Sequence, residues 1–207
     1  MLFHEIGGRS TVLGLNLDLG LTRSVLKYHM AIVPIIKAPN PMLAKKCTDL
    51  DKIDNKLIKN LKETLDKQKN PVGAGLAAPQ IGVLKRVCLV RKFFPDPKNP
   101  QEELFDEYVL VNPTIKVSSR KTTLDWEGCL SVPDIYGMVK RAKKIKISAL
   151  DETGNKIEFS ASGLFAREIQ HEIDHLDGIL FTSKVIGKKH SQKELSRMYS
   201  IDDAPVI

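Results

Sequence analysis

Two histidines one helical turn apart constrain this chain more than any other feature of its sequence. Residues 171–175 are His-Glu-Ile-Asp-His, and on an α-helix the two imidazoles would lie about 40° apart on one face, where both can bind a single metal ion. Glu172 would lie about 60° from His175, too far round for a third ligand but able to reach a water molecule beside the ion. The pattern predicts two metal ligands and a general base, and the alternative is a surface helix with two unrelated histidines.

The residues around this pattern predict a helix that is mostly buried. Ser162 is a suitable N-cap and Gly178 a suitable residue to follow the C-terminus, which gives the helix about four turns. Apolar side chains at helical spacing form one stripe along it, made of Phe165, Ile169, Ile173 and Leu176. A narrower polar strip of Gln170, Asp174 and Asp177 is expected to face solvent.

Two histidines do not complete such a site, since catalytic zinc-type centres usually have three protein ligands and an open position for water. The chain contains three cysteines. Cys88 lies in the apolar run 87–90, which indicates a buried strand where cysteine behaves as a small hydrophobe. Cys47 follows two lysines in a loop-like stretch and has no evident role. Cys129 differs from both, because it follows a glycine and precedes a proline-containing turn, where backbone and ligand can approach closely.

Three segments of the chain, in this order, resemble the signature motifs of the peptide deformylases. The three together are far more specific than any one of them, and the resemblance covers about residues 32–185. They are Gly73-Ala74-Gly75-Leu76-Ala77-Ala78-Pro79-Gln80, Glu127-Gly128-Cys129-Leu130-Ser131 and Gln170-His171-Glu172-Ile173-Asp174-His175-Leu176.

The resemblance implies one divalent metal ion bound by the thiolate of Cys129 and the imidazoles of His171 and His175. Fe²⁺ is the typical ion of the family, and Zn²⁺, Ni²⁺ or Co²⁺ can occupy the same ligands. One thiolate and two neutral imidazoles would leave the centre with a net positive charge, which suits it to lower the pKa of a water molecule. Glu127 and Arg141 are expected either to pair and steady the loop that holds Cys129 or to form a solvated ion pair.

The activity implied is hydrolysis of the N-formyl group from the initiator methionine of nascent polypeptides, with release of formate. Glu172 would act as general base and then as general acid. The side-chain amide of Gln80 and the backbone N–H of Leu130 would stabilise the negative oxygen that forms. The segment Gly73-Ala74-Gly75 would bind the substrate backbone. Without the resemblance, the first motif is simply a glycine-rich turn before the strand at Val87.

A metalloprotease is the main alternative enzyme, because many proteins with this histidine pattern take a downstream glutamate as third ligand. Glu194 lies at a usable distance along the chain. However, residues 187–193 are strongly basic and indicate the start of a solvated helix. That assignment also leaves Cys129 and the first motif unexplained.

A basic nucleic-acid-binding protein is the third possibility. The chain has 32 Lys and Arg against 25 Asp and Glu, a net charge of +7, which permits attraction to RNA. Aromatic residues make up only 6% of the sequence, and no known nucleic-acid-binding motif is present, so no DNA partner is expected. The basic tail from Lys184 to Arg197 could instead bind ribosomal RNA weakly.

The remaining composition predicts an intracellular enzyme. No apolar run approaches the length needed to cross a bilayer, so no membrane partner is expected. The number of cysteines is odd, and one of them is the expected thiolate ligand, which indicates a reducing compartment. We expect a cytoplasmic protein if the host is bacterial and an organellar one if it is eukaryotic, although residues 1–29 contain no recognisable targeting signal.

We expect three parts along the chain. Residues 1–29 would be an N-terminal extension of unknown role, residues 30–187 the peptide deformylase catalytic domain, and residues 188–207 a basic C-terminal tail. The catalytic domain should be α+β, with antiparallel β-sheets packed around the central metal-binding helix, an N-terminal helix and a C-terminal helical tail.

Local patterns predict the individual elements. The N-terminal helix is expected to be capped by Asp51 and to end at Asn70-Pro71, with an apolar stripe of Ile53, Leu57, Leu61 and Leu65. The acidic and proline-containing residues 93–106 should form a surface insertion. Strands are expected at residues 87–90, 108–111, 115–117, 145–149 and 157–159.

Overall fold

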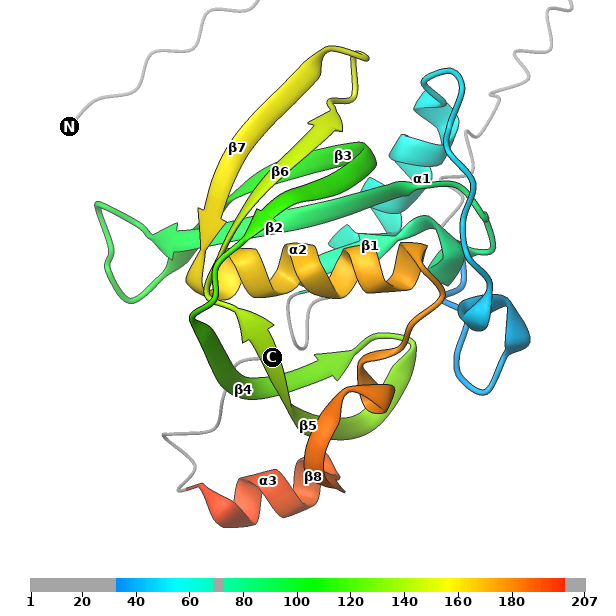
Figure 1. The fold of residues 1–207 in the computed structure, drawn as a ribbon. Helices are drawn as coiled ribbons and strands as arrows, with labels where there is room; N and C mark the ends of the chain where they lie inside the picture. Colours follow the sequence, from blue (N-terminus) through cyan, green and yellow to red (C-terminus); the bar gives the residue numbers. More distant parts are fainter. Residues whose placement is uncertain (1–32, 69–72, 200–207) are drawn as a thin grey trace, which may run out of the picture.

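The computed structural model describes residues 33–68 and 73–199, and this part of the chain has the predicted mixed α+β fold with antiparallel sheets (Figure 1). Its helical elements are η1 (Pro41–Ala44), α1 (Asn55–Asp66), η2 (Ala78–Ile81), α2 (Gly163–Leu176), η3 (Phe181–Ser183) and α3 (Gln192–Met198). Its strands are β1 (Gly75–Ala77), β2 (Val87–Pro95), β3 (Glu103–Ser118), β4 (Thr122–Cys129), β5 (Val132–Ala142), β6 (Lys144–Leu150), β7 (Lys156–Ser162) and β8 (Val185–His190).

The strands form two sheets that lie on either side of α2. The larger sheet has the order β1-β2-β3-β6-β7 and the smaller one β4-β5-β8. Figure 1 shows α2 running between them, and the helix contacts strands of both. Every paired strand in the two sheets is antiparallel to its neighbour.

The predicted apolar stripe is what holds α2 against the larger sheet. Ile169, Ile173 and Leu176 are buried in one cluster with residues of β2, β3 and β6, and Phe165 packs against its edge. Full burial of such a side chain contributes about 1.5 to 3 kcal/mol. The predicted limits of this helix are confirmed, since Ser162 is its N-cap and Gly178 follows its C-terminus with a φ of 74°.

The helix α1 begins three residues later than predicted. Asp54, not Asp51, is its N-cap, and the Asp54 side chain accepts a hydrogen bond of 3.0 Å from the N–H of Leu57. Leu57, Leu61 and Leu65 are buried as expected. The helix ends at Asp66, and the predicted stop at Asn70-Pro71 lies outside the described residues.

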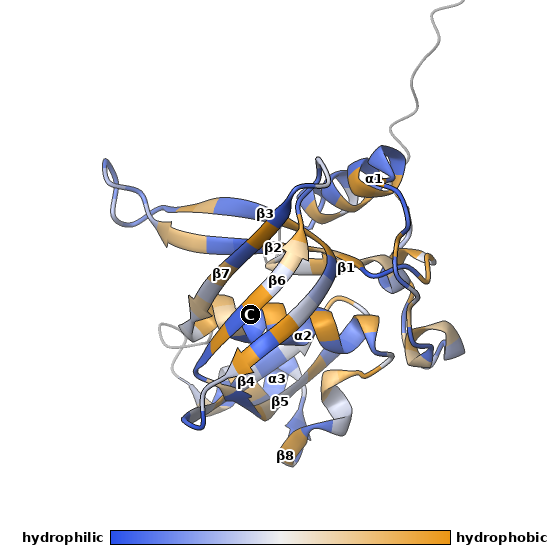
Figure 2. Cartoon of the chain, turned by 45° about the horizontal axis from the view of Figure 1, so that its top comes forward, coloured by the Kyte–Doolittle hydropathy of each residue, from blue (hydrophilic) through white to orange (hydrophobic). Residues whose placement is uncertain are grey.

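The expected surface insertion at residues 93–106 is instead the outer half of the β2–β3 hairpin. Phe93 pairs with Phe105 in register, and their rings lie 5.7 Å apart in an edge-to-face arrangement. Cross-strand aromatic pairs of this kind stabilise a hairpin that has no core beneath it. Only the turn between the strands is irregular, and Figure 2 shows that it is hydrophilic.

The C-terminal region also differs from the prediction. Residues expected to start a solvated helix form the edge strand β8, which pairs with β5, and α3 begins only at Gln192. The proposed boundary between residues 187 and 188 therefore falls within a strand. Leu195 of α3 is buried. Among the helices of the described segments, none has the length and apolar character needed to cross a lipid bilayer.

Candidate active site

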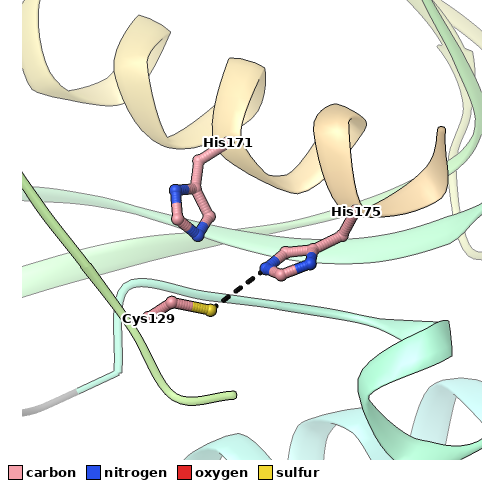
Figure 3. A group of neighbouring side chains, drawn as sticks. All are labelled: Cys129, His171 and His175. Atoms are coloured by element: carbon pink, nitrogen blue, oxygen red, sulfur yellow. Dashed lines mark hydrogen bonds between the residues drawn. The ribbon is translucent and has the colours of Figure 1, made fainter. Parts of the chain in front are cut away.

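The side chains of Cys129, His171 and His175 converge from two separate elements. Cys129 is the last residue of β4, and both histidines lie on α2 (Figure 3). One ligand atom from each residue lies within 4.8 Å of the other two, and the Cys129 sulfur is 3.2 Å from His175 Nε2. Within residues 33–68 and 73–199, no other group of His, Cys, Asp and Glu side chains has this arrangement.

A break in the strand ladder sets the position of Cys129. Glu127 pairs with Gly137, but two residues later Cys129 pairs with Val132, so the β4–β5 register shifts at this point. Bulges of this kind re-aim side chains. The Cys129 sulfur accepts hydrogen bonds from Ser131 N–H at 3.4 Å and from Gln80 Nε2 at 3.7 Å.

These surroundings favour the thiolate. Burial alone would raise the pKa of the Cys129 thiol, but His175 and His171 outweigh it and hold the pKa well below its ordinary value. A thiolate beside two imidazoles is a suitable donor set for a divalent transition metal. The residues present therefore fit the metal that the sequence pattern implies.

The carboxylate of Glu127 orients the first histidine. Its Oε2 atom lies 3.0 Å from His171 Nδ1. Burial would raise the pKa of Glu127, but hydrogen bonds from Arg141 and His171 lower it far below the ordinary range. An ionised carboxylate only accepts, so His171 Nδ1 carries a proton and the other ring nitrogen is the candidate metal donor.

The predicted pair of Glu127 and Arg141 is confirmed, and it is buried. Arg141 donates two hydrogen bonds of 2.8 Å to the two Glu127 oxygens, and the side chains are only 4% and 3% exposed. Arg167 adds a third donor at 2.7 Å. The alternative of a solvated surface pair is therefore wrong.

The prediction for Asp174 is also wrong. Predicted to face solvent, it is buried and accepts hydrogen bonds from Arg141 and from Lys184. Neither Arg167 nor Lys184 was expected in this network, because nothing in the local sequence indicates partners so far along the chain.

Glu172 is buried beside the two histidines. It is 2% exposed, and its Oε2 atom has no hydrogen-bond partner in the described part of the chain. Burial raises the pKa of Glu172 well above its ordinary value; His171 opposes this, and Cys129 and Glu168 add to it. An unpaired buried carboxylate is costly, and such groups are typical of functional sites.

Gln80 and Leu130 lie next to the same cysteine. Gln80, on η2, is 1% exposed, and its Oε1 atom accepts a 2.7 Å hydrogen bond from Ala77 N–H. That bond turns its Nε2 group toward the Cys129 sulfur and the Ser131 hydroxyl, which is 3.2 Å away. Leu130 follows Cys129 in the β4–β5 turn, and its carbonyl accepts a hydrogen bond from Lys37.

The glycine-rich motif leads into β1, an edge strand of the larger sheet. Gly73 is buried, and a Cβ there would lie 2.5 Å from Leu65 Cδ1. Ala74 accepts a hydrogen bond from Arg91 N–H. Gly75 pairs with Val90. The alternative interpretation, a simple turn before Val87, is incomplete, because Gly75 also lies directly against Glu172.

Gly75→Ala should lower the turnover number by at least about 10-fold, because the added Cβ would lie 2.5 Å from Glu172 Oε1 and 2.8 Å from its Cδ. Glu172 is buried and cannot move aside freely. Steady-state kinetics on the metal-loaded variant measures the effect. An unchanged turnover number would show that the position of Glu172 is not critical.

The metalloprotease alternative is not supported by the position of Glu194. Its carboxylate accepts a 2.7 Å hydrogen bond from Ser191 N–H and forms the capping box of α3. It is not a member of the cysteine and histidine group.

Comparisons with known proteins agree with this geometry. The model of the family described as polypeptide deformylase matches residues 32–191. A peptide deformylase of Thermodesulfovibrio yellowstonii is 42% identical over 156 residues, which are 75% of this chain and 90% of that protein. Peptide deformylase 1 of Bacillus subtilis is 40% identical over 172 residues, 82% of this chain and 99% of the relative.

Solved structures give the same result. A class I type b peptide deformylase of Acinetobacter baumannii, bound to Met-Ala-Ser, has a TM-score of 0.67 and 34% identity, with 75% of this chain and 99% of that chain covered. A plant peptide deformylase has a TM-score of 0.66 and 38% identity, with coverage of 75% and 82%. Peptide deformylases are metal-dependent hydrolases that remove the N-formyl group of nascent polypeptides, and by sequence and fold this chain belongs to their family.

Proposed function

We propose that this chain hydrolyses the N-formyl group from the initiator methionine of nascent polypeptides at a metal centre held by Cys129, His171 and His175. The observation that carries the proposal is the convergence of these three ligand atoms beside the unpartnered Oε2 atom of Glu172. Fe²⁺ is the proposed native ion, with Zn²⁺, Ni²⁺ and Co²⁺ as substitutes. The bound ion would polarise the formyl carbonyl and lower the pKa of water.

Glu172 is the proposed proton carrier. It takes a proton from the attacking water and passes it to the departing amine, which gives formate and a free N-terminus. Its buried position supports this role, because burial raises the pKa of Glu172 above that of an exposed glutamate and so brings it nearer to neutral pH. A group that must accept and then donate a proton works best with such a pKa.

Gln80 and Leu130 are the proposed donors to the oxygen that becomes negative. Ala77 N–H holds the Gln80 amide with its Nε2 group beside the Cys129 sulfur, where it would donate to that oxygen in place of its long 3.7 Å contact with the sulfur. The Leu130 backbone lies in the same turn as Cys129. Peptide substrate would extend along β1 near Gly73, Ala74 and Gly75, since an edge strand can pair with an extended chain.

Selectivity is proposed to be steric. A formyl carbon carries only hydrogen, so a tight site can admit it and exclude an acetyl or peptidyl carbon. An anaerobic assay compares formyl-Met, acetyl-Met and unmodified peptides of one sequence, with metal analysis of the same sample. We expect formate release from the formyl peptide alone. Metal-loaded protein that leaves this peptide intact would refute the proposal.

We further propose that residues 30–187 belong to the catalytic domain, which continues to the end of β8, and that the basic C-terminal tail associates weakly with ribosomes. Lys188, Lys189 and Lys193 are exposed and make no ion pair with another described residue. Attraction of this kind weakens as the salt concentration rises. Ribosomes that make formylated chains would place the enzyme in a bacterial cytoplasm or in an organelle.

A further inference from the structure

A series of charged side chains in contact with one another leads from the proposed metal ligands toward the surface. Glu127 contacts His171 at 3.0 Å and receives both hydrogen bonds of the Arg141 fork. The remaining nitrogen of the same guanidinium, Nη1, donates a hydrogen bond to Asp174. Arg141 therefore divides its hydrogen bonds between two carboxylates that lie at 3% and 12% side-chain exposure.

Lys184 is the outermost residue of this series. Its Nζ atom lies 2.6 Å and 2.7 Å from the two oxygens of Asp174. The lysine side chain is 38% exposed, whereas Asp174 is nearly covered. The two carboxylates of the network are thus surrounded by three cations, Arg141, Arg167 and Lys184.

The turn that carries Lys184 also contacts the candidate ligand directly. Lys184 is the C-cap residue of η3, and Phe181 is the first residue of the same turn. Phe181 is 1% exposed, and its ring stacks on the His171 imidazole with a centroid distance of 5.9 Å and an angle of 29°. One short turn therefore contacts the histidine by an aromatic face and the helix by an ion pair.

We propose that Lys184 is a positioning residue for His171 and acts through Asp174, Arg141 and Glu127. Without Lys184, Asp174 would keep a buried charge with one remaining partner. Arg141 would then be the remaining cation beside Asp174 among the described residues, and a stronger attraction to Asp174 would weaken its two hydrogen bonds to Glu127. Weaker contact with Glu127 would leave the His171 ring less well oriented. The inference rests on the proposed metal site.

Co²⁺ titration of the metal-free protein against a competing chelator tests this directly. Lys184→Met should bind Co²⁺ about 10-fold more weakly than the wild type, and its turnover number should fall while KM stays unchanged. Lys184→Arg keeps the cation and should recover most of the affinity. Lys116→Met is the matched control, since Lys116 is an exposed lysine of β3 without an ion pair among the described residues.

A double-mutant cycle shows whether the lysine acts through the aspartate. Asp174→Asn alone should weaken Co²⁺ binding, and adding Lys184→Met should cause no further loss. Wild-type affinity in Lys184→Met, or additive losses in the double mutant, would overturn the inference. A wild-type protein that binds Co²⁺ yet leaves formyl peptides intact would instead refute the proposed function, and the affinity measurements would still decide the role of Lys184.

Discussion

Glu172→Gln should lower the turnover number by about 10²- to 10⁴-fold and leave the metal content unchanged. Glutamine has the shape of glutamate, so it should still pack against Gly75, where the space around Glu172 is tight. It cannot, however, accept a proton from water at neutral pH. Because Glu172 is not one of the three converging ligands, the metal should remain. Stopped assays of formate release, with metal analysis of the same samples, measure both quantities.

Glu168→Gln is the control for this change. Glu168 lies one turn earlier on α2 and is partly buried, and its charge also raises the pKa of Glu172. Removing it takes one negative charge from the neighbourhood without removing the proposed proton carrier, so its turnover number should fall far less than that of Glu172→Gln. Near-normal turnover in Glu172→Gln would show that another group carries the proton.

The parts of the site that lie on one helix were predictable from the sequence. His171 and His175 share a face because of the helical repeat, with Glu172 beside it, and the apolar stripe from Phe165 to Leu176 defines the side of α2 that packs on the larger sheet. Cys129 could not be joined to them by any local rule, because it lies more than 40 residues earlier along the chain. Only the three motifs taken together linked the two segments.

The wrong predictions also concern residues whose structure depends on other parts of the chain. Asp174 has the polar character of a solvent-facing residue, and its burial depends on Arg141 and Lys184, which arrive from other elements. The strand β8 has mostly exposed side chains, so it lacks an alternating pattern and depends on backbone pairing with β5. At the start of α1, Asp51 and Asp54 are equally good caps, and only the course of the backbone selects between them.

Cys129→Ala should weaken metal binding by more than about 100-fold and abolish hydrolysis of the formyl peptide, since loss of a ligand costs more than loss of a residue that only orients one. The buried sulfur lies 3.2 Å from His175 Nε2, and alanine leaves no donor in its place. Two imidazoles from one helix would remain. Dialysis against a chelator, followed by metal analysis, measures the loss.

Glu194→Gln separates the deformylase assignment from a metalloprotease with the same histidine pattern. Glu194 caps α3 through Ser191, so its replacement should loosen that helix without changing the metal content. A protease would behave in the opposite way, keeping its metal without Cys129 and losing it without Glu194. We expect the deformylase outcome, because His175 and His171 hold the pKa of Cys129 low, which suits a metal ligand, whereas burial raises the pKa of Cys88.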